Sequence, residues 1–506
     1  MGDIVKNSND VQEKTASPDT AVEQGATEQI EHVTSTEEGK DSRASPPQRG
    51  GNRQFDIEVP ENSQKRKLII SLAWPALVEN IFTSIMSMIS MMMVGGLANS
   101  ASAIAAVGLV TQPRFIMLSI FMAMNIGTTA IIARCKGAND PESANNALRQ
   151  ALMLTFAFTF VLCALMLAFN EYIIRFIAGN MDEETIQLGI DYMRIQIWGF
   201  PTMSLTFAMN AALRGAGNTR ATLFNTSAAN VANVIFSFLL IYGALGFPRM
   251  EVEGASLAVV IGQTVGLISA SFVLLQGRQY IRIRPRGWKI DMAMIKRIWN
   301  IGLPALFEQV VMRVGMLWFA VIVAGLGTIQ FAAHMVAMNM QMLSFTTGMA
   351  FGTAATTLVG QSLGRQRPDL AKLYVKMTNN LGIIVSAIIA ALLFIFSRQL
   401  TSLYTNEYDV INLASAMIMI VALSNPISNA RFVYVASLRG AGDARFTLII
   451  TFVGILLARP AIALLLVNVF NLGLHGVWIA LVSDSVICYF LAFFRYRGGK
   501  WTKIKV

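Results

Sequence analysis

The chain has 506 residues, of which 54% are hydrophobic and only 14% are charged, and it carries a formal net charge of +10. This composition is too apolar for one soluble domain of that length and is typical of a membrane protein that crosses the bilayer many times. The positive charge does not indicate nucleic-acid binding, because no basic patch with interleaved aromatic residues lies outside the apolar segments.

Residues 1–64 differ from the rest, since Glu, Ser, Thr, Asn, Gln, Gly and Pro dominate and aromatic residues are few. Such a segment buries too little apolar surface to order itself, so we expect a disordered cytoplasmic tail. The chain has three cysteines and no CxxC spacing. We therefore expect no disulfide framework, no metal site and no bound cofactor.

Apolar segments of about 20 residues or more, long enough to cross the hydrocarbon layer as helices, follow the tail. We expect twelve spans, at 68–95, 105–133, 147–169, 188–213, 221–243, 254–276, 298–325, 331–359, 374–397, 411–438, 446–468 and 476–494.

The stretch Leu213-Arg214-Gly215-Ala216-Gly217-Asn218-Thr219-Arg220 returns as Leu438-Arg439-Gly440-Ala441-Gly442-Asp443-Ala444-Arg445. In each copy the arginine complements a helix C-terminus, the second glycine takes a left-handed conformation, and Asn218 or Asp443 caps the next helix. Trp74 to Glu79 likewise matches Leu303 to Glu308. Residues 68–276 and 297–497 are therefore two copies of one unit.

The duplication predicts five parts: the tail at 1–64, an N-lobe at 65–276, a cytoplasmic linker at 277–297, a C-lobe at 298–497 and a basic cytoplasmic end at 498–506. With six spans per half, the second half re-enters the membrane in the same orientation as the first. That arrangement is typical of a carrier that works by alternating access between two bundles.

Lysine and arginine concentrate in alternate loops, from Lys65 to Lys67 at the start to Arg495 to Lys505 at the end, whereas the other loops hold acidic residues such as Asp182 and Glu407. By the positive-inside rule, both termini are cytoplasmic.

Glu79 and Glu308 lie at matching places about 11 residues into the first and seventh spans, roughly 16 Å deep at 1.5 Å per residue. An ionised side chain at that depth costs about 2.5 to 3.5 kcal/mol, so each one needs a reason. One interpretation is that both face a central cavity where protons and cationic substrate compete for them. The alternative is a structural role, in which each is a neutral acid that bridges helices, or Glu308 pairs with Arg313.

Asp484 in the twelfth span and Arg459 in the eleventh form either a buried ion pair or part of a proton path. His334 is either a proton relay or a buried structural histidine. One face of the fifth span carries Asn230, Asn233 and Ser237. These side chains either coordinate Na⁺ or hydrogen-bond to substrate, or they form hydrogen bonds that hold helices together.

The motifs resemble those of the multidrug and toxic compound extrusion (MATE) transporters over nearly all of residues 66–505, in a prokaryotic branch. The similar segments are Trp74 to Leu77, Val94 to Leu97, both Leu-Arg-Gly-Ala-Gly copies and, above all, Val359 to Ala371. The resemblance implies twelve helices in two six-helix lobes forming a V. It also implies a carboxylate late in the first helix and another in the fifth, but here those places hold Ser90 and Ser237, with Asn233 matching the family's asparagine.

We therefore expect an all-α membrane protein in the plasma (inner) membrane that works as a monomer without nucleic acid. It exports amphipathic, often cationic, small organic compounds in exchange for H⁺ or Na⁺ and touches membrane lipid along its spans. The alternative is a flippase for a lipid-linked precursor. We expect no enzyme, because three histidines and no HExxH or GxSxG motif leave no convergent catalytic set.

Overall fold

The computed structural model describes residues 61–97, 100–179, 181–277, 279–283, 288–404 and 407–504. The predicted tail lies outside these residues except for 61–64. Throughout the described residues the regular structure is helical. The predicted all-α class is therefore confirmed.

The first half contains six long helices, and α1 begins inside the predicted tail. The helices are α1 (Asn62–Gly95), α2 (Ser100–Gly137), α3 (Pro141–Ala178), α4 (Glu183–Gly215), α5 (Thr219–Tyr242) and α6 (Glu251–Leu275), with a short 3₁₀ turn, η1 (Ala244–Gly246), after α5. Each predicted apolar segment of this half falls within one of them to within two residues.

The second half repeats this order with two breaks. Its elements are α7 (Met292–Ala324), α8 (Thr328–Gly364), α9 (Pro368–Ile395), α10 (Ser397–Ser402), α11 (Tyr408–Gly440), α12 (Ala444–Thr451), η2 (Phe452–Ala458), α13 (Arg459–Asn468), α14 (Gly473–Arg497) and η3 (Lys500–Lys503). Helix α7 starts within the predicted linker, because Asp291 caps it by accepting from the Ala293 and Met294 backbone N–H groups.

Ten described segments are long and apolar enough to cross a membrane. The chain is therefore a multi-pass membrane protein. Of the twelve predicted spans, the two in α4 and α8 are not among these ten segments, although the two helices have 33 and 37 residues.

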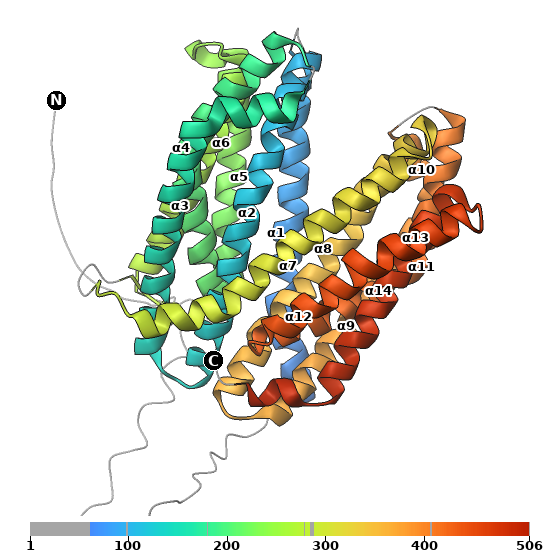
Figure 1. Cartoon of the computed structure of the whole chain (residues 1–506). Coiled ribbons are helices and arrows are strands. Elements are labelled where there is room, and N and C mark those ends of the chain that lie inside the picture. The colour runs from blue at the N-terminus through green and yellow to red at the C-terminus, as the bar shows by residue number, and fades with distance from the viewer. Residues whose placement is uncertain are drawn as a thin grey trace, which may run out of the picture. The chain divides into compact units, whose positions relative to one another are not determined.

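Each half packs mainly on itself. In the first half α4 contacts α2, α3 and α6, and α5 contacts α1 and α6; in the second, α11 contacts α8, α9 and α14. Figure 1 shows the green helices α3 to α6 gathered together, and the orange and red helices α9 and α11 to α14 likewise. The halves meet where α2 contacts α7 and α8, and where α1 contacts α8.

The two copies of the repeated octapeptide end α4 and α11. Gly217 and Gly442 have φ angles of +80° and +87°, which confirms the predicted left-handed glycines. Asn218 caps α5 by accepting from the Ala221 N–H at 3.1 Å. The same prediction for Asp443 is wrong, because its carboxylate accepts from Arg495 of α14 at 2.8 Å instead.

The eleventh predicted span is a single rod with π-helical turns in its middle, at Phe452–Ala458. Pro460 lies two residues beyond these turns, and its missing N–H and its ring disrupt the regular ladder of hydrogen bonds. A wider turn accommodates that disruption and is frequent near functional sites. The corresponding helix of the first half, α5, is uniformly α-helical.

Helix α2 packs against α4 through the same contact that α8 makes with α11. The Thr129 hydroxyl donates to the Ala211 carbonyl at 3.0 Å, and Thr356 donates to Ala436 at 2.9 Å. A Cβ atom built on Gly215 or on Gly440 would press on the backbone of Thr129 or Thr356 respectively. Only glycine permits these close approaches.

Alanine at Gly215 or Gly440 is therefore expected to destabilise the protein by about 1 to 3 kcal/mol through overpacking. The measurement is the thermal unfolding midpoint of purified protein. Gly108→Ala on α2 is the matched control, since no atom lies within 4 Å of its built Cβ. Equal midpoints for all three variants would contradict the packing described for these glycines.

Candidate functional site

Glu79 on α1 is surrounded by groups from α4 and α5. Arg214 Nη1 lies 3.5 Å from its Oε1 atom, and the hydroxyls of Thr222 and Thr226 lie 3.0 Å from Oε2 and Oε1. The Glu79 side chain is 12% exposed. Every partner is a hydrogen-bond donor, and this environment suits an ionised carboxylate.

Glu308 on α7 has the same set of partners from α11 and α12. Arg439 Nη2 lies 2.5 Å from Oε1, and the hydroxyls of Thr447 and Thr451 lie 3.0 and 2.8 Å from Oε2 and Oε1. This side chain is more enclosed, at 2% exposure. The alternative partner Arg313 instead lies over the Phe115 ring of α2, 4.4 Å from its centroid.

The two sites are copies of each other. In both, the arginine ends one helix and the threonines follow 8 and 12 residues later on the next, as in Arg214, Thr222 and Thr226. The threonines share a helix face because they are four residues apart. We name these groups the first cage (Glu79, Arg214, Thr222, Thr226) and the second cage (Glu308, Arg439, Thr447, Thr451).

Each cage contains one hydroxyl with a second acceptor nearby. Thr222 Oγ1 lies 2.9 Å from the Thr219 carbonyl, and Thr447 Oγ1 lies 3.0 Å from the Ala444 carbonyl. A hydroxyl has one proton to donate and two lone pairs. It therefore donates to an ionised carboxylate, and can accept from a protonated one while donating to the backbone.

A line of polar pairs continues from the first cage along α1 and α5. Thr83 donates to the Glu79 carbonyl at 2.8 Å and accepts from Asn230 at 3.0 Å. Farther along, Ser90 donates to Asn233 Oδ1 at 3.0 Å. Among the described residues, no group hydrogen-bonds to the buried Nδ2 atom of Asn233, and Ser237 on the same helix is buried.

The second half has no counterpart of this line. The positions that match Thr83 and Ser90 hold Met312 and Phe319 on α7, and those that match Asn230 and Asn233 hold Ile455 and Ala458. The cages are therefore common to both halves, whereas the additional polar pairs belong to the first half.

Arg459 and Asp484 form a buried ion pair between α13 and α14. Arg459 Nη2 and Nε lie 2.5 and 2.6 Å from Asp484 Oδ2. Their side chains are 8% and 0% exposed, and the guanidinium also lies over the Phe319 ring. Asp484 Oδ1 accepts from Ser485 at 3.1 Å. This geometry matches the ion-pair interpretation.

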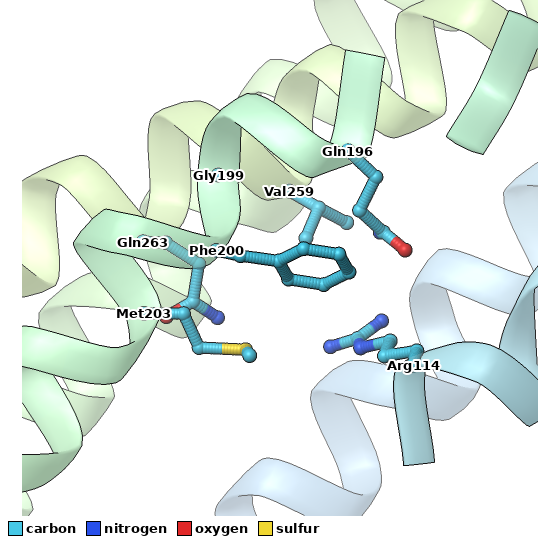
Figure 2. Close-up of a pocket in the computed structure, with 7 residues that line it drawn as sticks. All are labelled: Arg114, Gln196, Gly199, Phe200, Met203, Val259 and Gln263. Atoms are coloured by element: carbon cyan, nitrogen blue, oxygen red, sulfur yellow. The ribbon is translucent and has the colours of Figure 1, made fainter. Parts of the chain in front are cut away.

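His334 on α8 lies among the rings of Phe319, Phe331 and Trp478, and its Nδ1 atom is buried without a hydrogen-bond partner in the described residues. These surroundings match the interpretation as a buried structural histidine. Figure 2 shows a separate small cavity where Arg114 of α2 points toward Phe200 and Met203 of α4. Its volume of about 10 Å³ is room for one water molecule.

Breaking the Arg459–Asp484 pair from one side is expected to destabilise the protein strongly. Arg459→Leu leaves a buried uncompensated carboxylate, at a cost of about 3 to 5 kcal/mol, whereas the Arg459→Leu, Asp484→Leu double variant recovers much of that loss. Thermal unfolding of the three variants measures the effect. If the double variant is stable but fails to transport, the pair belongs to a proton path.

Comparison with known proteins agrees with the division of the chain into two similar halves. A family model described as MatE matches residues 75–239 and 304–464, one stretch in each half. The probable multidrug resistance protein NorM of Thermotoga maritima is 28% identical over 450 residues, covering 88% of this chain and 94% of that protein. The probable multidrug resistance protein YoeA of Bacillus subtilis is 24% identical, covering 84% and 91%.

Solved structures are similar in fold. An outward-facing MATE family transporter of the MOP superfamily has a TM-score of 0.81 at 22% identity, covering 87% of this chain and 97% of that one. A crystal structure of MATE in complex with MaD3S has a TM-score of 0.80 at the same identity. Because the family model matches most of both halves, the chain belongs to the MATE family of membrane transporters.

Proposed function

We propose that the protein is a secondary antiporter that exports amphipathic, often cationic, organic compounds in exchange for H⁺ or Na⁺ by alternating access. The observation that carries the proposal is the pair of equivalent carboxylate cages, one in each half, built on Glu79 and Glu308. The names of the relatives from Thermotoga maritima and Bacillus subtilis, both probable multidrug resistance proteins, support the substrate class.

Exchange follows from competition for the same carboxylates. In each cage the carboxylate pairs with one positive charge at a time. In this structure that charge is the arginine, and a proton, Na⁺ or a cationic substrate can replace the arginine. Protonation is tolerated locally, because Thr222 and Thr447 each have a backbone carbonyl to which they can donate instead. The membrane potential contributes about 2.3 kcal/mol per charge per 100 mV, which is enough to drive such a cycle.

The two halves have different roles in this proposal. The polar pairs Thr83–Asn230 and Ser90–Asn233 extend the first cage, and with Ser237 they form the path of the coupling ion. Oxygen ligands of these types suit both Na⁺ and a hydrogen-bonded chain for protons. The second cage lacks this extension, so ion and substrate compete at both carboxylates but only the first half has the added path.

We also propose that α4 and α8 complete a set of twelve spans in two six-helix lobes, with a V between them and both termini in the cytoplasm. Neither helix is among the ten strongly apolar segments, which fits helices that face other protein or a water-filled path rather than lipid. The domain bounds are those predicted, except that α1 and α7 begin before the predicted starts of their lobes, at Asn62 and Met292, and the protein works as a monomer.

Glu79→Gln and Glu308→Gln are each expected to lower transport by at least about tenfold while leaving folded protein in the membrane, because neither amide can exchange a proton for a cation. Inverted vesicles with an imposed pH gradient, and then an imposed Na⁺ gradient, measure fluorescent-drug uptake and identify the coupling ion. Glu142→Gln is the matched control, an exposed glutamate in the first turn of α3.

Normal uptake by the Glu79→Gln, Glu308→Gln double variant would refute this site. Movement of a lipid-linked precursor without any drug uptake would instead favour the flippase alternative.

A further inference from the structure

The ends of α2 and α8 cross between the two halves, and glycines make the crossing possible. A Cβ atom built on Gly137 of α2 would overlap the Gln361 carbonyl of α8, and one built on Gly364 of α8 would overlap the Arg134 carbonyl of α2. The two contacts are reciprocal, since Arg134 and Gln361 occupy matching places before the two glycines. We call this contact the α2–α8 crossing.

The crossing is hydrogen-bonded to the turns that carry the cage arginines. Gln361 Nε2 donates to the Gly215 carbonyl at 3.2 Å, and Arg134 Nη2 donates to the Ala441 carbonyl at 2.9 Å. Each bond joins a helix of one half to the repeated octapeptide of the other. The Thr357 hydroxyl of α8 adds a bond of 2.9 Å to the carbonyl of Arg214 itself.

Arg214 therefore makes one contact within its own half and one contact with the other half. Its side chain pairs with Glu79 inside the first half, and its backbone carbonyl accepts from Thr357 of the second half. Arg439 is placed in nearly the same way. Its side chain pairs with Glu308, and the carbonyl two residues later, at Ala441, accepts from Arg134 of the first half.

We propose that Arg214 and Arg439 are positioning residues that couple the charge of Glu79 and Glu308 to closure of the α2–α8 crossing. This inference rests on the proposed antiport. Protonating a carboxylate removes the counter-charge of a largely enclosed guanidinium, which is costly in a medium of low polarity. The arginine then leaves the cage, its turn shifts, and the hydrogen bonds from Thr357, Gln361 and Arg134 break.

The direction in which protonation moves the α2–α8 crossing agrees with the exchange of substrate for protons. A proton taken up from the outside opens the crossing toward the cytoplasm, and loss of that proton inside allows it to close again. Short, reciprocal contacts between rigid helices suit such a two-state element, because they are either made or lost together. The C-terminal end reports the same event, since Arg134 also donates to the Ile504 carbonyl at 2.8 Å.

Spin-label distances across the crossing test the proposal directly. Glu142 and Asp369 are exposed residues in the first turns of α3 and α9, just beyond the ends of α2 and α8. Cysteines at both places, in protein lacking Cys135, Cys163 and Cys488, carry the labels in lipid nanodiscs. We expect a longer distance to gain population as the pH falls.

Five variants locate the coupling. Glu79→Gln is expected to raise the ratio of long to short distances about tenfold at neutral pH, and Arg214→Gln should do the same and remove the part of the pH response that comes from Glu79, leaving the part that comes from Glu308 and Arg439. Arg214→Lys keeps the charge and should restore part of that response. Thr357→Val should weaken the response, whereas Thr353→Val, whose hydroxyl bonds within its own helix, should not.

Identical distance distributions in the wild type, Glu79→Gln and Arg214→Gln at every pH would overturn the coupling. This result is distinguishable from failure of the antiport proposal, because the distances are measured without substrate or gradient. Loss of drug uptake in Glu79→Gln with unchanged distances would leave the antiport standing and refute the role of Arg214. A pH-dependent distance without gradient-driven drug uptake would support the role of Arg214 and refute the antiport.

Discussion

A charge inside a membrane protein needs a partner of opposite charge, and three such pairs organise this molecule. Glu79 pairs with Arg214, Glu308 with Arg439, and Asp484 with Arg459. The first two pairs join helices distant in sequence, and the third joins the neighbouring helices α13 and α14. Each pair therefore helps to determine which helices pack together as well as how the charge is held. Two of the pairs are one interaction built twice, because the chain is a duplication.

The halves share a scaffold but have diverged in their interiors. Thr83, Ser90, Asn230 and Asn233 form polar pairs in the first half, where the second half has Met312, Phe319, Ile455 and Ala458. Conversely, within the part of the chain that the structure describes, only the second half has π-helical turns, at Phe452–Ala458 beside the Arg459–Asp484 pair. Duplication supplied two similar cages, and different neighbours allow them to take different roles.

Much of the fold was predictable because apolar length and the repeated octapeptide are local signals. The left-handed Gly217 and Gly442 and the Asn218 cap followed from the same residues. The partner of Glu308 was not predictable, because Arg439 is 131 residues away and only helix packing brings it close. The equal spacing of arginine and two threonines in both copies was a readable signal for the cages. Nothing local distinguished Asp443, which binds Arg495, from the capping Asn218.

In the proposed cycle Glu79 and Glu308 gain and lose protons while the protein works. Infrared difference spectra recorded across a pH change detect protonated carboxylic acids directly and need no substrate. We expect a protonated-acid band that grows as the pH falls, is reduced by either Glu79→Gln or Glu308→Gln, and loses both contributions in the double variant. An unchanged band in the double variant, or no band in the wild type, would contradict the proposed cycle.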